Sequence, residues 1–258
     1  MIPTQSLQEI QRSIDTSLGV KTRRVSKRVL VAELGFMVPG RPTAPRYKTE
    51  IVEERTELWS KLVGVLFCLP TSKTGKEEIL PNLDYFHHRS ALFVDFFCVG
   101  YGTHPGTGPD ELRPAPVSVV DNAQWRFSSQ EFNNCRAAIE SLTKWQFSGE
   151  TDLLLAVARK PKSGQATLDY SCAIACNLEE MIRDEAITSV RAFFEKLFQF
   201  GEQFTGPDPV WKLSDKLGVQ SATGLLEDAV LTLVPEVVRK RYKAARHFAV
   251  SNVGRTDA

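Results

Sequence analysis

The chain has 258 residues, of which 42% are hydrophobic and 24% are charged, and its 32 basic and 31 acidic residues give a net charge of +1. A chain of this size and composition buries a core without disulfides or metal, and its near-neutral balance excludes a global field that would steer it to nucleic acid or anionic lipid.

The cysteines and the apolar runs indicate the compartment. The five cysteines are an odd number with no Cys-x-x-Cys pair, a usage typical of a reducing interior. The longest apolar runs, about eight or nine residues, are far short of a membrane span, and the first twenty residues lack the apolar region of a signal peptide. We therefore expect a soluble, cytosolic protein with no membrane partner.

Residues 1–27 are predicted to form a polar and basic N-terminal arm with a short helix. Leu7, Ile10 and Ile14 recur at helical spacing within residues 5–17. A basic cluster follows this helix and comprises Lys21, Arg23, Arg24, Lys27 and Arg28.

Residues 28–204 are predicted to form an α+β core domain. Its sheet is expected to be mixed or largely antiparallel, with about five to six strands packed against amphipathic helices. The expected strands are the apolar runs at residues 29–36, 62–69, 91–99, 152–158 and 168–176. The expected helices run from Ser128 or Ser129 to about residue 143, and from Asn177 to Phe204, because a capping residue precedes an acidic first turn in each.

Residues 205–258 are predicted to form a C-terminal helical extension, since the segment 205–209 is rich in proline and glycine. Two helices are expected, over residues 221–234 and 235–250. The last helix is basic, and a helix of this kind can contact phosphates or an acidic protein surface. The candidate partner- or phosphate-binding residues on it are Arg239, Lys240, Arg241, Lys243 and Arg246. The alternative is that these basic residues form a solvated face of the helix and bind no partner.

The spacing Arg241-x5-His247 on that helix resembles the Arg-x4–6-His motif of the HEPN ribonucleases. The resemblance implies a ribonuclease in which Arg241 and His247 are catalytic. It covers a single helix, and the sheet-rich remainder of the chain departs from that all-helical family.

A buried-looking strand, Ala91 to Val99, opens into a loop rich in glycine and proline that extends to Pro116. A strand that holds a residue beneath a covering loop is a common way to build a ligand site. The glycine spacing over residues 100–108 differs from the dinucleotide-binding pattern, so no cofactor is expected. We expect either a lid or partner-binding loop or a plain connection, and the candidate contact residues are Gly102, His104 and Gly106.

The densest group of polar residues around this strand comprises Asp84, His87, His88, Arg89 and Asp95. A carboxylate inside an apolar strand is costly unless it is paired, and Arg89 is the expected partner of Asp95. In the catalytic alternative, Asp95 is a general base and His87 or His88 carries protons. Because neighbouring residues of an extended segment point to opposite sides, the adjacent histidines predict no metal site.

Two weaker patterns favour plain structural roles. The segment from Pro70 to Glu77 ends in Gly-Lys after an apolar strand, but it lacks the first glycine and the Ser/Thr of a phosphate-binding loop, which predicts an exposed strand connection. Asp152 and Asp169 lack the Glu-x-Lys pair of a nuclease, so both are predicted to be strand-end residues.

The preferred hypothesis is a cytosolic binding or interaction protein, a subunit of a larger assembly whose basic N-terminal and C-terminal segments contact a protein partner or nucleic acid. The alternative is a phosphoryl- or nucleotide-directed hydrolase, similar to a nuclease, that uses Asp95, His87 or His88, and Arg89 under the glycine-rich loop. The group that neutralises Asp95 separates the two hypotheses.

Overall fold

The computed structural model of the chain describes residues 6–31, 46–58, 60–90, 94–103, 115–161, 163–204, 230–244 and 249–254. Its helices are α1 (Leu7–Ser17), η1 (Gly75–Ile79), η2 (Leu80–Asn82), α2 (Leu83–Ser90), α3 (Ser129–Leu142), α4 (Leu178–Arg183), α5 (Val190–Phe204) and α8 (Glu236–Ala244). Its strands are β1 (Gly19–Val31), β2 (Arg46–Leu58), β3 (Ser60–Phe67), β4 (Val94–Cys98), β5 (Tyr101–Gly102), β6 (Pro116–Val120), β7 (Ala123–Phe127), β8 (Asp152–Arg159), β9 (Thr167–Asn177) and β10 (Val250–Asn252).

The central sheet has five strands in the order β10-β9-β8-β3-β4. Strands β3 and β4 are parallel, whereas the other neighbours are antiparallel. This confirms the predicted α+β class with a mixed sheet. A second, three-stranded sheet has the order β5-β7-β6 and was not predicted.

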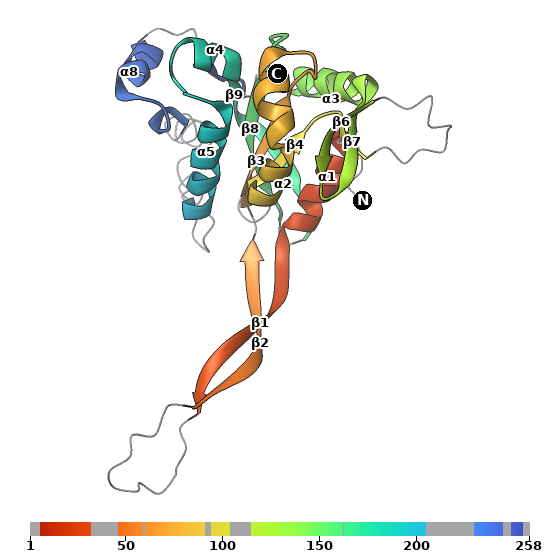
Figure 1. Cartoon of the computed structure of the whole chain (residues 1–258), viewed down its shortest axis with the longest axis vertical. Coiled ribbons are helices and arrows are strands. Elements are labelled where there is room, and N and C mark those ends of the chain that lie inside the picture. Colours follow the sequence, from red (N-terminus) through yellow and green to blue (C-terminus); the bar gives the residue numbers. More distant parts are fainter. Residues whose placement is uncertain are drawn as a thin grey trace, which may run out of the picture.

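Both faces of the central sheet are buried, which explains the nearly continuous apolar runs of its strands. In β3, Leu62 and Leu66 belong to one hydrophobic core, and Val63 and Phe67 belong to another on the opposite face. Helix α5 lies on one side of the strands, and α1 and α3 lie on the other (Figure 1). The fold is therefore a sheet between two helical layers.

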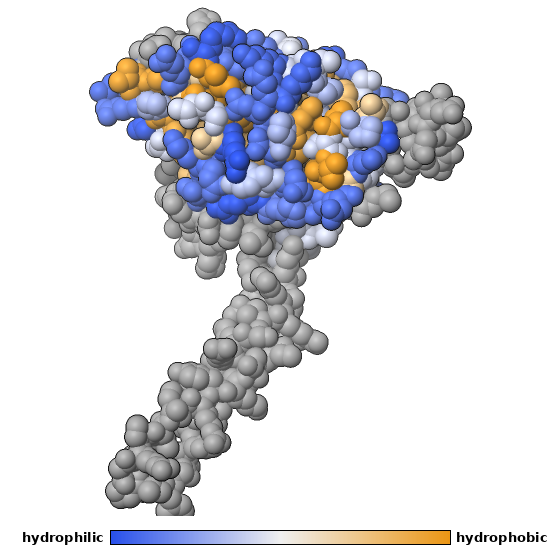
Figure 2. Space-filling view, viewed as in Figure 1, coloured by the Kyte–Doolittle hydropathy of each residue, from blue (hydrophilic) through white to orange (hydrophobic). Residues whose placement is uncertain are grey.

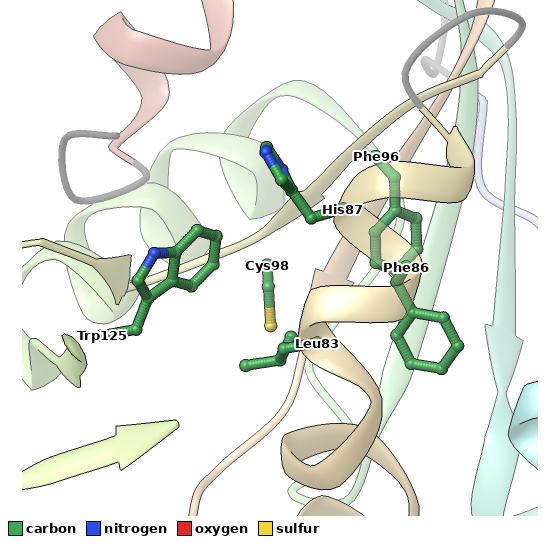
Figure 3. Close-up of a pocket in the computed structure, with 6 residues that line it drawn as sticks. All are labelled: Leu83, Phe86, His87, Phe96, Cys98 and Trp125. Carbon is green, nitrogen blue, oxygen red and sulfur yellow. The ribbon is translucent and has the colours of Figure 1, made fainter. Parts of the chain in front are cut away.

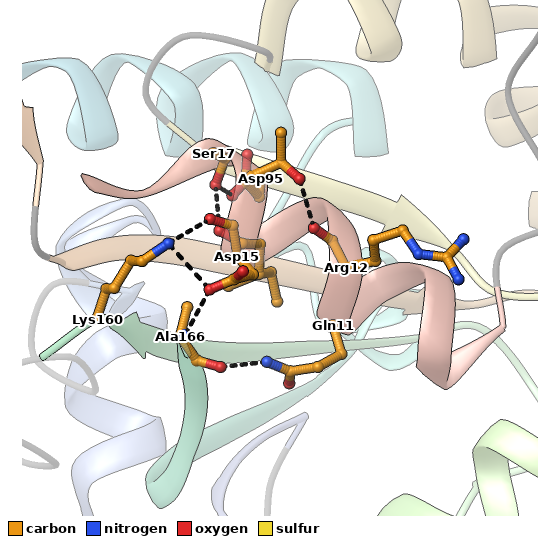
Figure 4. A network of polar contacts seen from close by, with 9 residues as sticks. Gln11, Arg12, Asp15, Ser17, Asp95, Lys160 and Ala166 are labelled. Carbon is orange, nitrogen blue, oxygen red and sulfur yellow. Dashed lines mark hydrogen bonds and ion pairs between the residues drawn. The ribbon is translucent and has the colours of Figure 1, made fainter. Parts of the chain in front are cut away.

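Helix α1 was predicted correctly, and it packs into the body of the protein. Ile10 and Ile14 are fully buried in the core beneath α3. Figure 4 shows Asp15 beside the turn between β8 and β9, where its carboxylate lies 3.0 Å from Lys160 Nζ and accepts the backbone N–H of Ala166 at 2.8 Å. Residues 6–18 thus contribute to the body, while the domain boundary after residue 27 stays a prediction.

Strands β1 and β2 form an antiparallel hairpin that projects away from the body (Figure 1). The pairing runs from Gly19 opposite Leu58 to Val31 opposite Arg46. Thirteen residues in each strand correspond to a length of about 43 Å. The predicted strand at residues 29–36 overlaps only the end of β1, because the alternating polar residues of the hairpin carry no apolar run.

The predicted helix at residues 177–204 is interrupted. Helix α4 ends before Glu185, whose φ of 58° is left-handed, and α5 begins only at Val190. The Oγ of Ser189 accepts the backbone N–H of Ala192 at 3.1 Å and so caps the new helix. Helix α3 begins where predicted, with Ser128 as its cap.

The C-terminal segment contains a helix, α8, within the predicted range 235–250, and it also contributes a strand to the central sheet. Strand β10 pairs with β9, with Val250 opposite Cys176. Val238 and Tyr242 of α8 are buried against the same core as α5. Residues 205–229 lie outside the described part, so the predicted boundary after residue 204 stays a prediction.

In the described part of the chain, no helix is both long enough and apolar enough to cross a membrane. The face of the body in Figure 2 is largely hydrophilic, with separate apolar areas. Among the described residues, the exposed large apolar side chains are Val119, Leu142 and Val237, which lie on β6, α3 and α8.

Candidate functional site

Asp95 is neutralised by Lys61, not by the predicted partner Arg89. Lys61 Nζ lies 2.5 Å from Asp95 Oδ1, and Ser17 at the end of α1 donates its hydroxyl to Oδ2. The Lys61 side chain is 3% exposed and that of Asp95 is 10% exposed. The register of β3 and β4 sets Val63 opposite Asp95, which places Lys61 two residues away on the same face. The costly carboxylate is thus held in a buried ion pair.

The polar residues that the sequence grouped around Asp95 lie on different faces of the sheet. Asp95 contacts α1, whereas its neighbour Phe96 packs edge-on against Phe86 of α2, with ring centroids 6.0 Å apart. His87 and His88 belong to α2, so the sheet separates them from Asp95. The predicted catalytic group is therefore not brought together.

Arg89 binds a different carboxylate, on α5. Its Nη2 lies 3.0 Å from Glu195 Oε1, and the Tyr85 hydroxyl also donates to Glu195. The hydrogen bond from Tyr85 and then that from Arg89 hold the pKa of Glu195 below its usual value. Arg89 thus joins α2 to α5.

The two histidines lie on a helix, so the prediction of an extended segment was wrong. Leu83 and Phe86 are buried at helical spacing in α2. Asp84 and His88 are four residues apart and share one side of the helix, with His88 Nε2 3.6 Å from Asp84 Oδ1. The premise that excluded a metal site therefore does not hold.

A fourth polar residue, Asp121, comes from the turn between β6 and β7. Asp121 and Asn122 form a two-residue hairpin turn, with φ values of 51° and 59° that Asp and Asn tolerate well. The backbone N–H of Asp121 donates to Asp84 Oδ1 at 2.9 Å, which joins the turn to α2. The Asp121 carboxylate lies 3.2 Å from His87 Nε2 and 2.9 Å from His88 Nε2.

We call this group of Asp84, His87, His88 and Asp121 the corner cluster. Asp84, His88 and Asp121 each offer one ligand atom, and these atoms all lie within 4.8 Å of one another. Their side chains are about half exposed, and that of His87 is 34% exposed. The cluster is open to solvent, in contrast to the buried pair of Asp95.

A cavity of about 20 Å³, close to the volume of one water molecule, lies beneath the corner cluster. Figure 3 shows its lining of Leu83, Phe86, His87, Phe96, Cys98 and Trp125. Trp125 is 4% exposed, and its Nε1 has no hydrogen-bond partner among the described residues. The indole nitrogen lies on the edge of the ring away from Leu83, and the six-membered ring of Trp125 extends toward His87 (Figure 3). The corner therefore contains the buried indole N–H of Trp125, which can donate a hydrogen bond to an acceptor.

Of the predicted partner-binding residues, the structure describes Gly102 and the side chains of Arg239 and Lys240. Gly102 is buried in β5 opposite Arg126, whereas His104 and Gly106 lie outside the described residues. On α8, Arg239 donates to the carbonyls of residues 231, 232 and 234, and Lys240 pairs with Glu236 at 3.0 Å. The side chains of Arg241, Lys243, Arg246 and His247 lie outside the described part, so the ribonuclease-like motif stays a prediction.

Asp152 and Asp169 make hydrogen bonds within the fold, in agreement with the structural roles predicted for them. Asp152 is buried, and its carboxylate accepts hydrogen bonds from Trp145 Nε1 at 3.1 Å and from Ser148. Burial raises the pKa of Asp152. Asp169 accepts a hydrogen bond from Ser171. Residues 73–82 continue as helical turns into α2, so the predicted exposed strand connection at residues 70–77 is in fact partly helical.

No family model, no curated protein and no solved structure matches the chain. The functional interpretation therefore depends on the residues of the chain and their contacts. The sequence reasoning missed Lys61 and Asp121, which only the packing places at these sites. An Asp-Asn pair between two β-rich segments is a hairpin signal that would have located the turn.

Proposed function

We propose that the protein is a cytoplasmic nucleic-acid-binding protein, a subunit of a larger assembly, whose contact arm is the hairpin of β1 and β2. The observation that carries the proposal is the charge pattern along the register of this hairpin. Strand β1 has five basic and no acidic residues, whereas β2 has four glutamates and three basic residues. The two strands together therefore contain more basic than acidic residues.

The register balances charge in the middle of the hairpin but not at its distal end. In the middle, the pairs Arg23 with Glu54, Arg24 with Glu53 and Lys27 with Glu50 set a basic residue opposite an acidic one. The last four pairs before residue 32 contain Arg28, Lys48 and Arg46 and no acidic residue. Positive charge therefore remains at the end of the arm that is farthest from the body (Figure 1).

The form of the arm fits a duplex. A two-stranded hairpin without a third strand is at best marginally stable by itself, so a partner surface would stabilise it. The major groove of a duplex admits a two-stranded ribbon, and basic residues supply the phosphate contacts. The cysteines support the proposed compartment: Cys68, Cys98, Cys135 and Cys176 are free and buried, as is usual in a reducing interior.

The hydrolase alternative is not favoured, because the sheet separates Asp95 from His87 and His88. The proposal rests on the arm and does not require a catalytic residue.

Fluorescence anisotropy with duplex DNA and duplex RNA at several salt concentrations tests the proposal. The triple variant Arg28→Gln, Arg46→Gln, Lys48→Gln should bind at least about 10-fold more weakly, and the slope of log K against log salt should fall by about 2–3, since three phosphate contacts are lost. The control removes the same charge from exposed residues of the body: Arg12→Gln, Lys144→Gln, Arg183→Gln. Equal losses in both variants, or no binding by the wild type at low salt, would contradict the proposal.

A further inference from the structure

The corner cluster has the chemistry of a metal site. Two carboxylates and an imidazole provide oxygen and nitrogen donors, a mixture that suits divalent first-row metals better than Mg²⁺ or Ca²⁺, which prefer all-oxygen sites. The donors come from two rigid elements, since Asp84 and His88 lie on α2 and Asp121 lies in the tight turn between β6 and β7. The position of the site therefore follows from the packing of α2 against the small sheet.

The spacing of the donor atoms agrees with one coordination sphere. Ligand atoms about 2.0–2.2 Å from a tetrahedral Zn²⁺ are about 3.3–3.6 Å from one another. His88 Nε2 lies 2.9 Å from Asp121 Oδ1 and 3.6 Å from Asp84 Oδ1. All three ligand atoms lie within 4.8 Å of one another, so binding of an ion requires the exposed side chains to adjust to the coordinated separations.

His87 provides the outer contact that metal-binding carboxylates usually have. Its Nε2 lies 3.2 Å from Oδ2 of Asp121, the oxygen that does not face His88. Such outer contacts orient a ligating carboxylate and raise metal affinity. His87 also lines the small cavity, so it connects the exposed donors to the interior.

Trp125 packs beside His87 at the same corner. Its ring lies 6.1 Å from that of His87 between centroids, and its buried Nε1 has no partner among the described residues. A buried N–H without an acceptor is costly, and such groups point to a polar ligand. A water or anion that accompanies a bound ion is an acceptor of this kind.

We propose that Asp84, His88 and Asp121 bind one Zn²⁺ ion, with His87 as the outer partner of Asp121. Three protein ligands leave at least one coordination position to solvent, and the exposure of all three side chains makes that position accessible. The site is independent of the hairpin arm and of the proposed nucleic-acid binding.

Zinc titration of the full-length chain without an affinity tag, in competition with a chromophoric chelator, tests this site. We expect saturable uptake of one Zn²⁺ per chain and weaker binding of Mg²⁺. His88→Ala should lower the Zn²⁺ affinity at least about 30-fold, because it removes a ligand. Asp84→Asn and Asp121→Asn should each lower it at least about 10-fold, because a neutral amide oxygen replaces a charged carboxylate ligand. His87→Ala should lower it about 10-fold, as expected for an outer partner.

A matched variant serves as the control. Glu236→Gln removes an exposed carboxylate of α8. It should keep the wild-type Zn²⁺ affinity. Far-UV circular dichroism verifies the fold, and Asp121→Asn retains a residue type that tolerates the left-handed turn. No saturable uptake by the wild type, tighter binding of Mg²⁺, or equal affinities of His88→Ala and Glu236→Gln would each overturn the proposal.

Discussion

Two regions of this protein hold an aspartate against a side chain that can carry positive charge, and they differ in burial. Asp95 is 10% exposed and is closed in by Lys61 and Ser17, whereas Asp121 is 49% exposed beside two histidines. In the buried region, pairing is obligatory, because an unpaired charge there would be costly. In the exposed region, water can solvate the charges, so the cluster remains available to a ligand. The comparison shows that a dense group of polar residues indicates a site only after burial is known.

The largest expected effect is the loss of the buried pair. Lys61→Met should lower the free energy of unfolding by about 3–5 kcal/mol, because it leaves Asp95 charged and buried without its partner. Urea denaturation followed by circular dichroism measures this loss. The double variant Lys61→Met, Asp95→Leu should recover most of it, since no buried charge remains. A loss below about 1 kcal/mol in the single variant would mean that the pair is hydrated, and the comparison would fail.

An intermediate effect is expected where α2 meets α5. Arg89 and Glu195 are each about one-third exposed, which places them between the buried Asp95 and the half-exposed Asp121. Glu195→Gln should lower the free energy of unfolding by about 1 kcal/mol at pH 7, because a charged hydrogen bond becomes a neutral one.

The pH dependence of that variant has a definite sign. The pKa of Glu195 is lowered in the folded protein, mainly by the hydrogen bond from Tyr85. Its contribution to stability is therefore present above the ordinary glutamate pKa of 4.5 and is lost as the pH falls through the lowered value. The difference in Tm between wild type and Glu195→Gln should shrink from pH 7 to pH 3. A difference that grows on acidification would contradict the assignment.

The smallest expected effect on stability is at the corner cluster. Without added metal, His88→Ala should change the free energy of unfolding by less than about 0.5 kcal/mol, because exposed ion pairs contribute little. The same urea experiment measures it, beside Lys61→Met. A loss above about 2 kcal/mol would show that the cluster clamps α2 to the small sheet, and the contrast with Asp95 would disappear.

Much of the fold was predictable because its local patterns are strong. The buried strands β3, β4, β8 and β9 appear as apolar runs, and Ser128 and Asn177 cap helices where predicted. Helix α2 was not predicted, because most of its residues are polar and the helical spacing is shown only by Leu83 and Phe86. Strand β2 was missed because charged residues dominate it.

The amino-acid sequence by itself determined that Asp95 lies in an apolar strand and needs a partner, since burying a charge is costly whatever the fold. Only the tertiary structure determined which residue neutralises Asp95. Lys61 is 34 residues away and Ser17 is 78 residues away along the chain. The sheet register and the docking of α1 bring them to Asp95, whereas Arg89, only six positions away, lies on the opposite face. Local spacing encodes helices and strands, but contacts between distant residues arise from packing, which no single segment specifies.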